Sequence, residues 1–223
     1  MSTYTLQLMI NSTDLSTLLE AGENIILARA FSDSASNVAW VSFKPFGNNS
    51  ISWEDQYGMY GAVTMSSGQI NPQSTTLIDV ASGMYYNFGP ATPVFTGPYS
   101  GPSAPGPGSF RVFNLLPPTA YPSFVFGLTQ NATVNGAAAA ASPTTAQVVP
   151  ANQFATFTPL ETVYVWLQSG VAAGAVVTVP PLVGLTAGLT LQATSRATKI
   201  QFTGASSLTY VYSSTAGAFV PSA

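Results

Sequence analysis

The chain has 223 residues, of which 46% are hydrophobic and only 6% are charged, and its net charge is −3. An ordinary soluble domain has about 25% charged residues, so Ser, Thr, Asn and Gln must supply most of the polar surface here. Five basic residues are too few to follow a nucleic-acid backbone, and without any Cys or His the chain has no disulfide, no thiolate site and none of the usual bases at neutral pH.

The first part of the chain alternates apolar and polar residues with the period of a β-strand. In the opening run TYTLQLMI, Tyr4, Leu6 and Leu8 face one way. The segment 12–23, STDLSTLLEAGE, is the best helix candidate, with Ser12 or Thr13 as its cap and Gly22 as its stop, although a loop is the alternative. Further strands are expected at 24–31, 38–43 and 57–65.

The stretch 44–61, KPFGNNSISWEDQYGMYG, combines three charged side chains with four aromatic ones. Residues 48–50, Asn-Asn-Ser, are expected to form a hairpin turn, because Asn tolerates positive φ, with Phe46 and Trp53 on either side. The aromatic rings can pack inside a sandwich, or they can stack on a sugar whose hydroxyls bind the polar neighbours. The candidate sugar surface comprises Asn49, Trp53, Glu54, Asp55, Tyr57 and Tyr60. The run MYYNF at 84–88 leaves the same two alternatives open.

Proline and glycine dominate the middle of the chain. Residues 89–108, GPATPVFTGPYSGPSAPGPG, are expected to form a loop, because proline donates no hydrogen bond to a strand ladder. A loop of this length is either an arm on a neighbouring subunit, a lid over a binding surface or an insertion. The alanine run 137–141 lies between Gly136 and Pro143, which are too close together for a stable helix, so a linker or a short strand is expected.

The remainder of the chain again predicts strands. The uncharged segment 171–191 contains Pro180 and Pro181, which argue against a membrane-spanning helix. The N-terminus has neither a basic region nor an apolar core, so no secretory signal is expected. A cytoplasmic location and non-classical export to the cell surface both remain open. The expected strands are 109–114, 123–130, 153–158, 161–168, 188–194, 197–202 and 207–212.

Many short strands separated by turn signals predict an all-β protein. We expect one antiparallel β-sandwich domain over residues 1–223, jelly-roll-like or Greek key, with a loop or arm at 89–108. The runs STYTLQLMINST, TFTPLETVYVWLQ and KIQFTGASSLTYVYSSTAGAF resemble a family of bacterial and fungal proteins related to the rhizosphere-expressed protein of Rhizobium. The resemblance covers a minor part of the chain, carries no diagnostic site and implies an all-β, non-catalytic protein.

The acidic residues give little support for catalysis or metal binding. Glycoside hydrolysis needs two carboxyl groups across a cleft. Glu54 and Asp55 are adjacent and would point to opposite faces of a strand, and nothing in the spacing pairs Glu54 with Glu161. No calcium-binding loop motif is present. We therefore expect a non-enzymatic protein without a metal or cofactor.

Three non-catalytic functions remain open. The charge deficit and the segment 89–108 favour a structural protein that assembles with itself into a fibre, lattice or inclusion. The aromatic residues among Asn, Gln and Ser favour a lectin-like module that binds neutral glycans. A third alternative is a toxin that inserts the segment 171–194 into a membrane as a hairpin. The expected partners are thus copies of the chain itself and neutral glycans, whereas nucleic acids and membranes are not expected.

Overall fold

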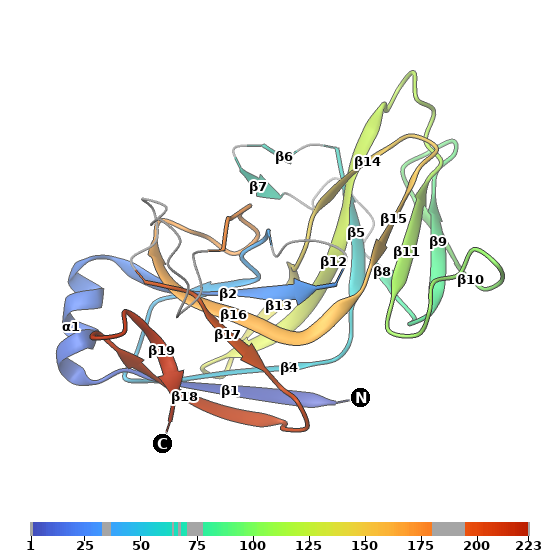
Figure 1. The fold of residues 1–223 in the computed structure, drawn as a ribbon. Coiled ribbons are helices and arrows are strands. Elements are labelled where there is room, and N and C mark those ends of the chain that lie inside the picture. Colours follow the sequence, from blue (N-terminus) through green and yellow to red (C-terminus); the bar gives the residue numbers. More distant parts are fainter. Residues whose placement is uncertain are drawn as a thin grey trace.

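The computed structural model describes residues 2–32, 37–63, 65–66, 68–70, 78–179 and 195–222. Within this part of the chain, most residues lie in strands and there is one α-helix. The strands form mainly antiparallel sheets that pack face to face (Figure 1), so the predicted all-β, sandwich-like fold is confirmed. Two of the strand pairs are parallel, which the prediction of a wholly antiparallel sandwich did not include.

The largest sheet, here called the main sheet, extends across most of the molecule (Figure 1). Its strand order is β19-β18-β1-β4-β12-β5-β8, and β13 and β14 also pair with β12. The long strand β12 therefore connects the two halves of this sheet. The strands are β1 (Thr3–Met9), β4 (Asn48–Glu54), β5 (Gly58–Ala62), β8 (Ile78–Asp79), β12 (Ser123–Val134), β13 (Ala137–Pro143), β14 (Gln147–Pro150), β18 (Ser207–Ser213) and β19 (Ala218–Pro221).

Two four-stranded sheets pack against the main sheet. The β16 sheet has the order β17-β16-β2-β3, and the β11 sheet has the order β10-β9-β11-β15. The β16 sheet consists of β2 (Glu23–Phe31), β3 (Val41–Phe43), β16 (Pro159–Ser169) and β17 (Thr198–Gln201). The β11 sheet consists of β9 (Met84–Phe88), β10 (Phe95–Tyr99), β11 (Phe110–Asn114) and β15 (Phe154–Phe157). The short strands β6 (Met65–Ser66) and β7 (Gln69–Ile70) form a separate pair.

Two large hydrophobic cores result from this arrangement. One lies between the main sheet and the β16 sheet and includes Leu6, Trp40 and Val165. The other lies between the main sheet and the β11 sheet and includes Phe88 and Phe126. Strand β1 is buried at alternate residues, as its sequence predicts, whereas β2 is buried almost throughout because its second face also packs in a cluster of its own.

The helix α1 (Ser12–Glu20) confirms the predicted helical segment, but its cap is Asn11 rather than Ser12 or Thr13. The Asn11 side chain accepts a hydrogen bond from the Asp14 N–H at 2.9 Å, which satisfies one of the free donors of the first turn. Gly22 follows the helix with a φ of +73°, so the predicted stop is confirmed.

The predicted turn at residues 48–50 is wrong, because this segment begins strand β4. Asn49 does bond the nearby backbone: its Oδ1 accepts from the Phe46 N–H at 2.9 Å, and its Nδ2 donates to the Phe46 carbonyl at 2.8 Å. The same Nδ2 donates to the Leu8 carbonyl of β1 at 3.0 Å. The bend therefore precedes Asn48, and it joins strands of two different sheets instead of forming a hairpin.

The predicted loop at 89–108 is partly wrong. Residues 95–99 form strand β10, which pairs with β9, and Phe95 packs on Phe88 with the ring centroids 4.7 Å apart. The alanine run is part of strand β13, the second of its two predicted forms. The expected strand at 188–194 and most of the expected hairpin at 171–194 lie outside the described residues.

Candidate functional site

The aromatic residues of the predicted sugar surface are buried in the cores. Trp53, Tyr57 and Tyr60 are 3%, 5% and 0% exposed, and Asn49 is 1% exposed. The prediction that these residues form an exposed stacking surface is therefore wrong. The physical reason is that Asn49 and Trp53 occupy the inward positions of β4, whereas Tyr57 and Tyr60 pack into two different buried clusters at and beside β5, which is buried on both faces. Of the six candidate residues, only Glu54 and Asp55 are left exposed.

Trp53 instead takes part in an aromatic cluster of the first core. Its ring makes edge contacts with Trp40 at 5.4 Å and with Phe202 at 5.2 Å between centroids. The hydroxyl of Tyr60 lies in a third buried cluster and donates to the Thr145 carbonyl at 2.8 Å. These contacts are those of packed core residues, which was the alternative left open for this stretch.

A buried arginine, which the sequence analysis missed, connects the sheets. Arg29 of β2 is 2% exposed, and its Nη2 donates to the Tyr57 hydroxyl at 2.8 Å and to the Leu160 carbonyl at 3.1 Å. Its Cζ lies 5.7 Å from the ring centroids of both Trp40 and Trp53, in the range of a cation–π contact. In the sequence Arg29 is one charged residue within a mostly apolar run, and nothing in that pattern indicates that its side chain is buried between the sheets.

The buried tyrosines predict a loss of stability at alkaline pH. Burial raises the pKa of Tyr57 from 10.0 to about 12, although the Arg29 charge acts in the opposite direction, and burial also raises the pKa of Tyr60. The folded state thus holds these protons more tightly than the unfolded state. The contribution of the raised Tyr57 pKa to folding stability is complete below pH 10 and is lost as the pH rises through about 12.

We expect the free energy of unfolding to fall by about 3 kcal/mol from Tyr57 alone over this range. Urea unfolding at a series of pH values between neutral and strongly alkaline measures it. The variant Tyr57→Phe is less stable at neutral pH, because it loses the bond from Arg29, but its decline above pH 10 should be shallower. Parallel pH profiles of the two proteins would contradict this assignment.

A polar hollow, here called the seam hollow, lies where β12 changes its partner from β5 to β4. β12 pairs with β5 through residues 125–129 and with β4 through 133–134, so the residues between have no partner strand on that side. The Gln130 side chain crosses part of this gap, and its Nε2 donates to the Glu54 carbonyl at 2.7 Å. The hollow has two parts, of about 360 and 200 Å³, which share Gln56 and Asn131.

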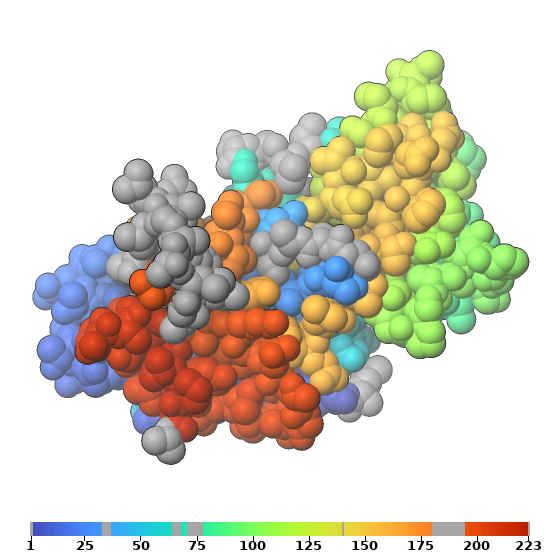
Figure 2. Space-filling view, viewed as in Figure 1, coloured from blue at the N-terminus to red at the C-terminus, as the bar shows by residue number. Residues whose placement is uncertain are grey.

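A row of four aromatic rings crosses the outer face of the β11 sheet. Each strand contributes one ring, and the centroids of Tyr99 and Tyr85, of Tyr85 and Phe113, and of Phe113 and Phe154 lie 5.3, 5.4 and 5.4 Å apart. We call these four residues the aromatic row. Tyr99 is 38% exposed and Phe154 is 50% exposed. In Figure 2 the green and yellow segments that build this sheet form one side of the molecule.

The aromatic row follows from strand alternation. In the run MYYNF, Tyr86 and Phe88 point into the second core, which leaves Tyr85 on the outer face. Packing inside the sandwich, one of the two alternatives for this run, is therefore confirmed for Tyr86 and Phe88. In β11, Phe113 and Arg111 share the outer face in the same way.

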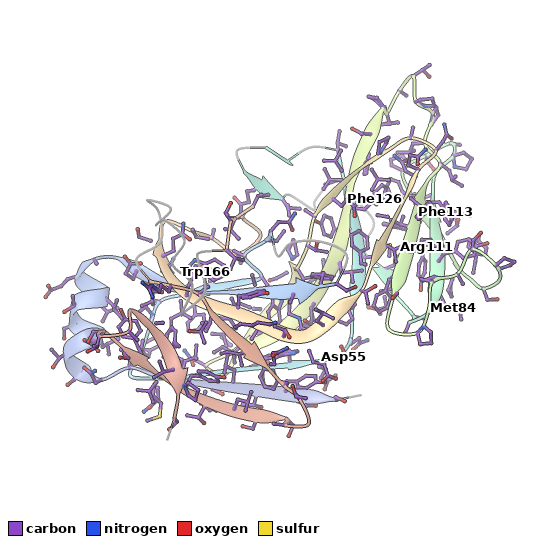
Figure 3. The ribbon with its side chains drawn as sticks, viewed as in Figure 1. Asp55, Met84, Arg111, Phe113, Phe126 and Trp166 are labelled. Carbon is purple, nitrogen blue, oxygen red and sulfur yellow. The ribbon has the colours of Figure 1, made fainter. Side chains whose placement is uncertain are left out.

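Arg111, which Figure 3 labels beside Phe113, lies over the Phe154 ring at one end of the aromatic row. Its Cζ is 4.7 Å from the Phe154 ring centroid, its Nε donates to the Thr156 hydroxyl at 3.0 Å, and its Nη1 donates to the Ser103 carbonyl at 2.7 Å. Arg111 is the one charged residue between Val80 and Leu160 in the sequence. The outer face of the β11 sheet thus combines aromatic rings with a single fixed cation.

A second apolar surface lies between β3 and β13. It is a groove of about 430 Å³, whose apolar lining includes Trp40, Phe43, Phe46, Ala137, Ala138 and Ala139. Phe46 is 58% exposed, the highest value among the large apolar side chains of the described residues. We call this surface the β3–β13 groove.

Within the described residues, no three or more acidic side chains are grouped closely enough to hold a metal ion. The same part of the chain contains no helix with the length and apolarity needed to cross a membrane. Comparisons with protein-family models, with curated proteins and with solved structures give no match. The resemblance to the rhizosphere-expressed protein family therefore stays a prediction, and the function must be inferred from the surfaces described above.

Proposed function

We propose that this chain is a non-enzymatic structural protein that assembles with copies of itself into a fibre, lattice or inclusion, and that the outer face of the β11 sheet makes the first contact. The observation that carries the proposal is the aromatic row. Tyr, Phe and Arg are enriched at protein interfaces, where acidic residues and Lys are depleted. The row and Arg111 have this composition, on a sheet that holds no other charge.

The charge distribution favours a second copy of the chain as the partner. Like-charged surfaces keep copies of a protein apart, but the whole chain has a net charge of only −3. Two β11 sheets that meet face to face bring together only one cation each, and each Arg111 is already bonded to Thr156 and Ser103 of its own subunit. The repulsion between copies is therefore small, and burial of the exposed rings favours association.

The β3–β13 groove supports growth beyond a dimer. A face that pairs with itself gives a closed dimer, whereas an extended assembly needs a second contact elsewhere on the subunit. The groove and the exposed Phe46 lie on the β3 and β13 edges, which share no residue with the aromatic row. Two separate apolar surfaces on one subunit fit a protein that forms long or two-dimensional arrays.

The double variant Tyr99→Ser, Phe154→Ser tests the proposal, because it removes the two most exposed rings of the row. We expect the unmodified protein to form assemblies, seen by sedimentation velocity and electron microscopy, and the double variant to be monomeric. The matched control is Leu19→Ser, Val63→Ser, whose side chains are 47% and 49% exposed but lie outside the row. Circular dichroism checks that each variant is folded.

Two results would overturn the proposal. One is an unmodified protein that stays monomeric at high concentration. The other is a row variant that assembles as well as the control variant, which would place the contact on another surface.

A further inference from the structure

The seam hollow is lined by two residues that each carry a buried polar atom without a hydrogen-bond partner among the described residues. These atoms are Trp53 Nε1, a donor, and Gln130 Oε1, an acceptor. Trp53 is 3% exposed and Gln130 is 2% exposed. Buried polar groups in folded proteins are almost always hydrogen-bonded to protein or to ordered water, so these two atoms beside the hollow call for a partner, which is either a water molecule or a polar group of a ligand.

The surrounding groups select the chemistry of that partner. The Gln130 amide is held by its Nε2 bond to the Glu54 carbonyl, which sets Oε1 as the remaining acceptor. Glu54 lines one part of the hollow and Asp79 lines the other, and no basic side chain lines either part. The two carboxylates disfavour phosphate and other anions. They accept hydrogen bonds strongly, which suits a neutral ligand rich in hydroxyl groups.

The size and mixed lining of the hollow fit a sugar ring. Its larger part, about 360 Å³, is at the lower end of the range for small-ligand sites, about 300 to 1,000 Å³. Apolar contacts come from Ala132, Ala138 and Ala139, which can face the C–H groups of a pyranose. The smaller part, across Gln56 and Asn131, has room for a substituent of the same ring.

We propose that the seam hollow binds one ring of a neutral carbohydrate. The ring lies in the larger part, with Trp53 N–H as a donor and the Glu54 carboxylate as an acceptor, and Gln130 Oε1 accepts from a substituent in the smaller part. Trp53 thus contributes a hydrogen bond from inside the sheet, rather than the exposed stacking surface expected from the sequence. The site lies on β4 and β12 and shares no residue with the aromatic row. The site is therefore separate from the first contact of the proposed assembly, although Ala138 and Ala139 also line the β3–β13 groove.

The experiment titrates the folded protein with free D-glucose, D-galactose, D-mannose, L-fucose and N-acetyl-D-glucosamine, and uses N-acetylneuraminic acid as the anionic comparison. Saturation-transfer NMR detects binding, and tryptophan fluorescence follows the titration. We expect saturable binding of at least one neutral sugar and none of the anionic one. The monomeric variant Tyr99→Ser, Phe154→Ser should bind equally well, which separates this result from that of the assembly test.

Two variants locate the site. Glu54→Gln changes an exposed carboxylate of the hollow and should weaken binding by about tenfold, the loss of one charged hydrogen bond. Trp53→Phe removes the N–H but keeps a ring, and should weaken binding further. Glu20→Gln, an exposed carboxylate on α1, is the control and should bind as the unmodified protein does. Absence of binding to all five neutral sugars, or equal affinity in Glu54→Gln and Glu20→Gln, would overturn the proposal.

Discussion

Replacement of Gly127 by alanine is expected to lower the free energy of unfolding by about 3 kcal/mol or more, since overpacking against backbone is costly. Gly127 lies in the middle of β12, opposite Tyr60 of β5. A Cβ atom at this position would overlap the Thr145 carbonyl oxygen and would approach Tyr60 Cε1 to 2.6 Å and the Tyr60 hydroxyl oxygen to 2.7 Å. The Tyr60 hydroxyl donates a hydrogen bond to the Thr145 carbonyl, and these two groups already fill the space that the Cβ would need.

Chemical denaturation of the purified variant measures this effect. Gly106→Ala is the matched control, because a Cβ there would meet no atom within 4 Å and the residue has no positive φ. We expect the control to unfold at nearly the same denaturant concentration as the unmodified protein. Equal stability of the two alanine variants would mean that β12 and β5 are not packed as described.

Truncation of Trp40 should have a comparable effect. Trp40→Ala is expected to lose about 3–5 kcal/mol, the usual cost of removing a large buried ring. Trp40 is 0% exposed, its Nε1 donates to the Gln130 carbonyl at 3.0 Å, and its ring contacts both Trp53 and Arg29. The variant therefore leaves a cavity, a Gln130 carbonyl that has lost one donor and a buried cation with fewer contacts.

Trp40→Phe separates these contributions, because it retains a ring but cannot donate to Gln130. We expect its loss of stability to lie between those of the unmodified protein and Trp40→Ala in thermal and denaturant unfolding. The position also affects the seam hollow, since Gln130 lines it. A Trp40→Ala protein within about 1 kcal/mol of the unmodified one, the range typical of surface substitutions, would contradict the packing of the first core.

Local alternation in the sequence was sufficient to predict most strands and the fold class. The runs at 24–31, 109–114 and 207–212 all form strands. The run at 109–114 buries alternate residues as period two predicts, whereas 24–31 is buried on both faces. The exception at residues 48–50 has a tertiary cause. Asn49 bonds its local backbone as expected, but it also bonds Leu8 of β1, and that contact fixes the segment as a strand.

Neither the aromatic row nor the seam hollow could be predicted from the sequence, because each depends on the pairing of distant strands. The aromatic row takes one ring from each of four segments, and the sequence does not say that β9 lies beside β11 in parallel. The seam hollow depends on where β12 exchanges β5 for β4. The sequence predicted Trp53 and Glu54 as members of an exposed sugar surface, whereas Trp53 is buried and both residues line a hollow that was not predicted.

The parallel pairing of β1 with β18 has a consequence for folding on the ribosome. Leu6 lies opposite Leu208, so the hydrogen-bonding edge of β1 waits for a strand that is translated about two hundred residues later. During that interval the nascent chain presents an open β edge with few charges to protect it. Contact between the exposed edges of neighbouring nascent chains during this interval is therefore a hazard of its synthesis.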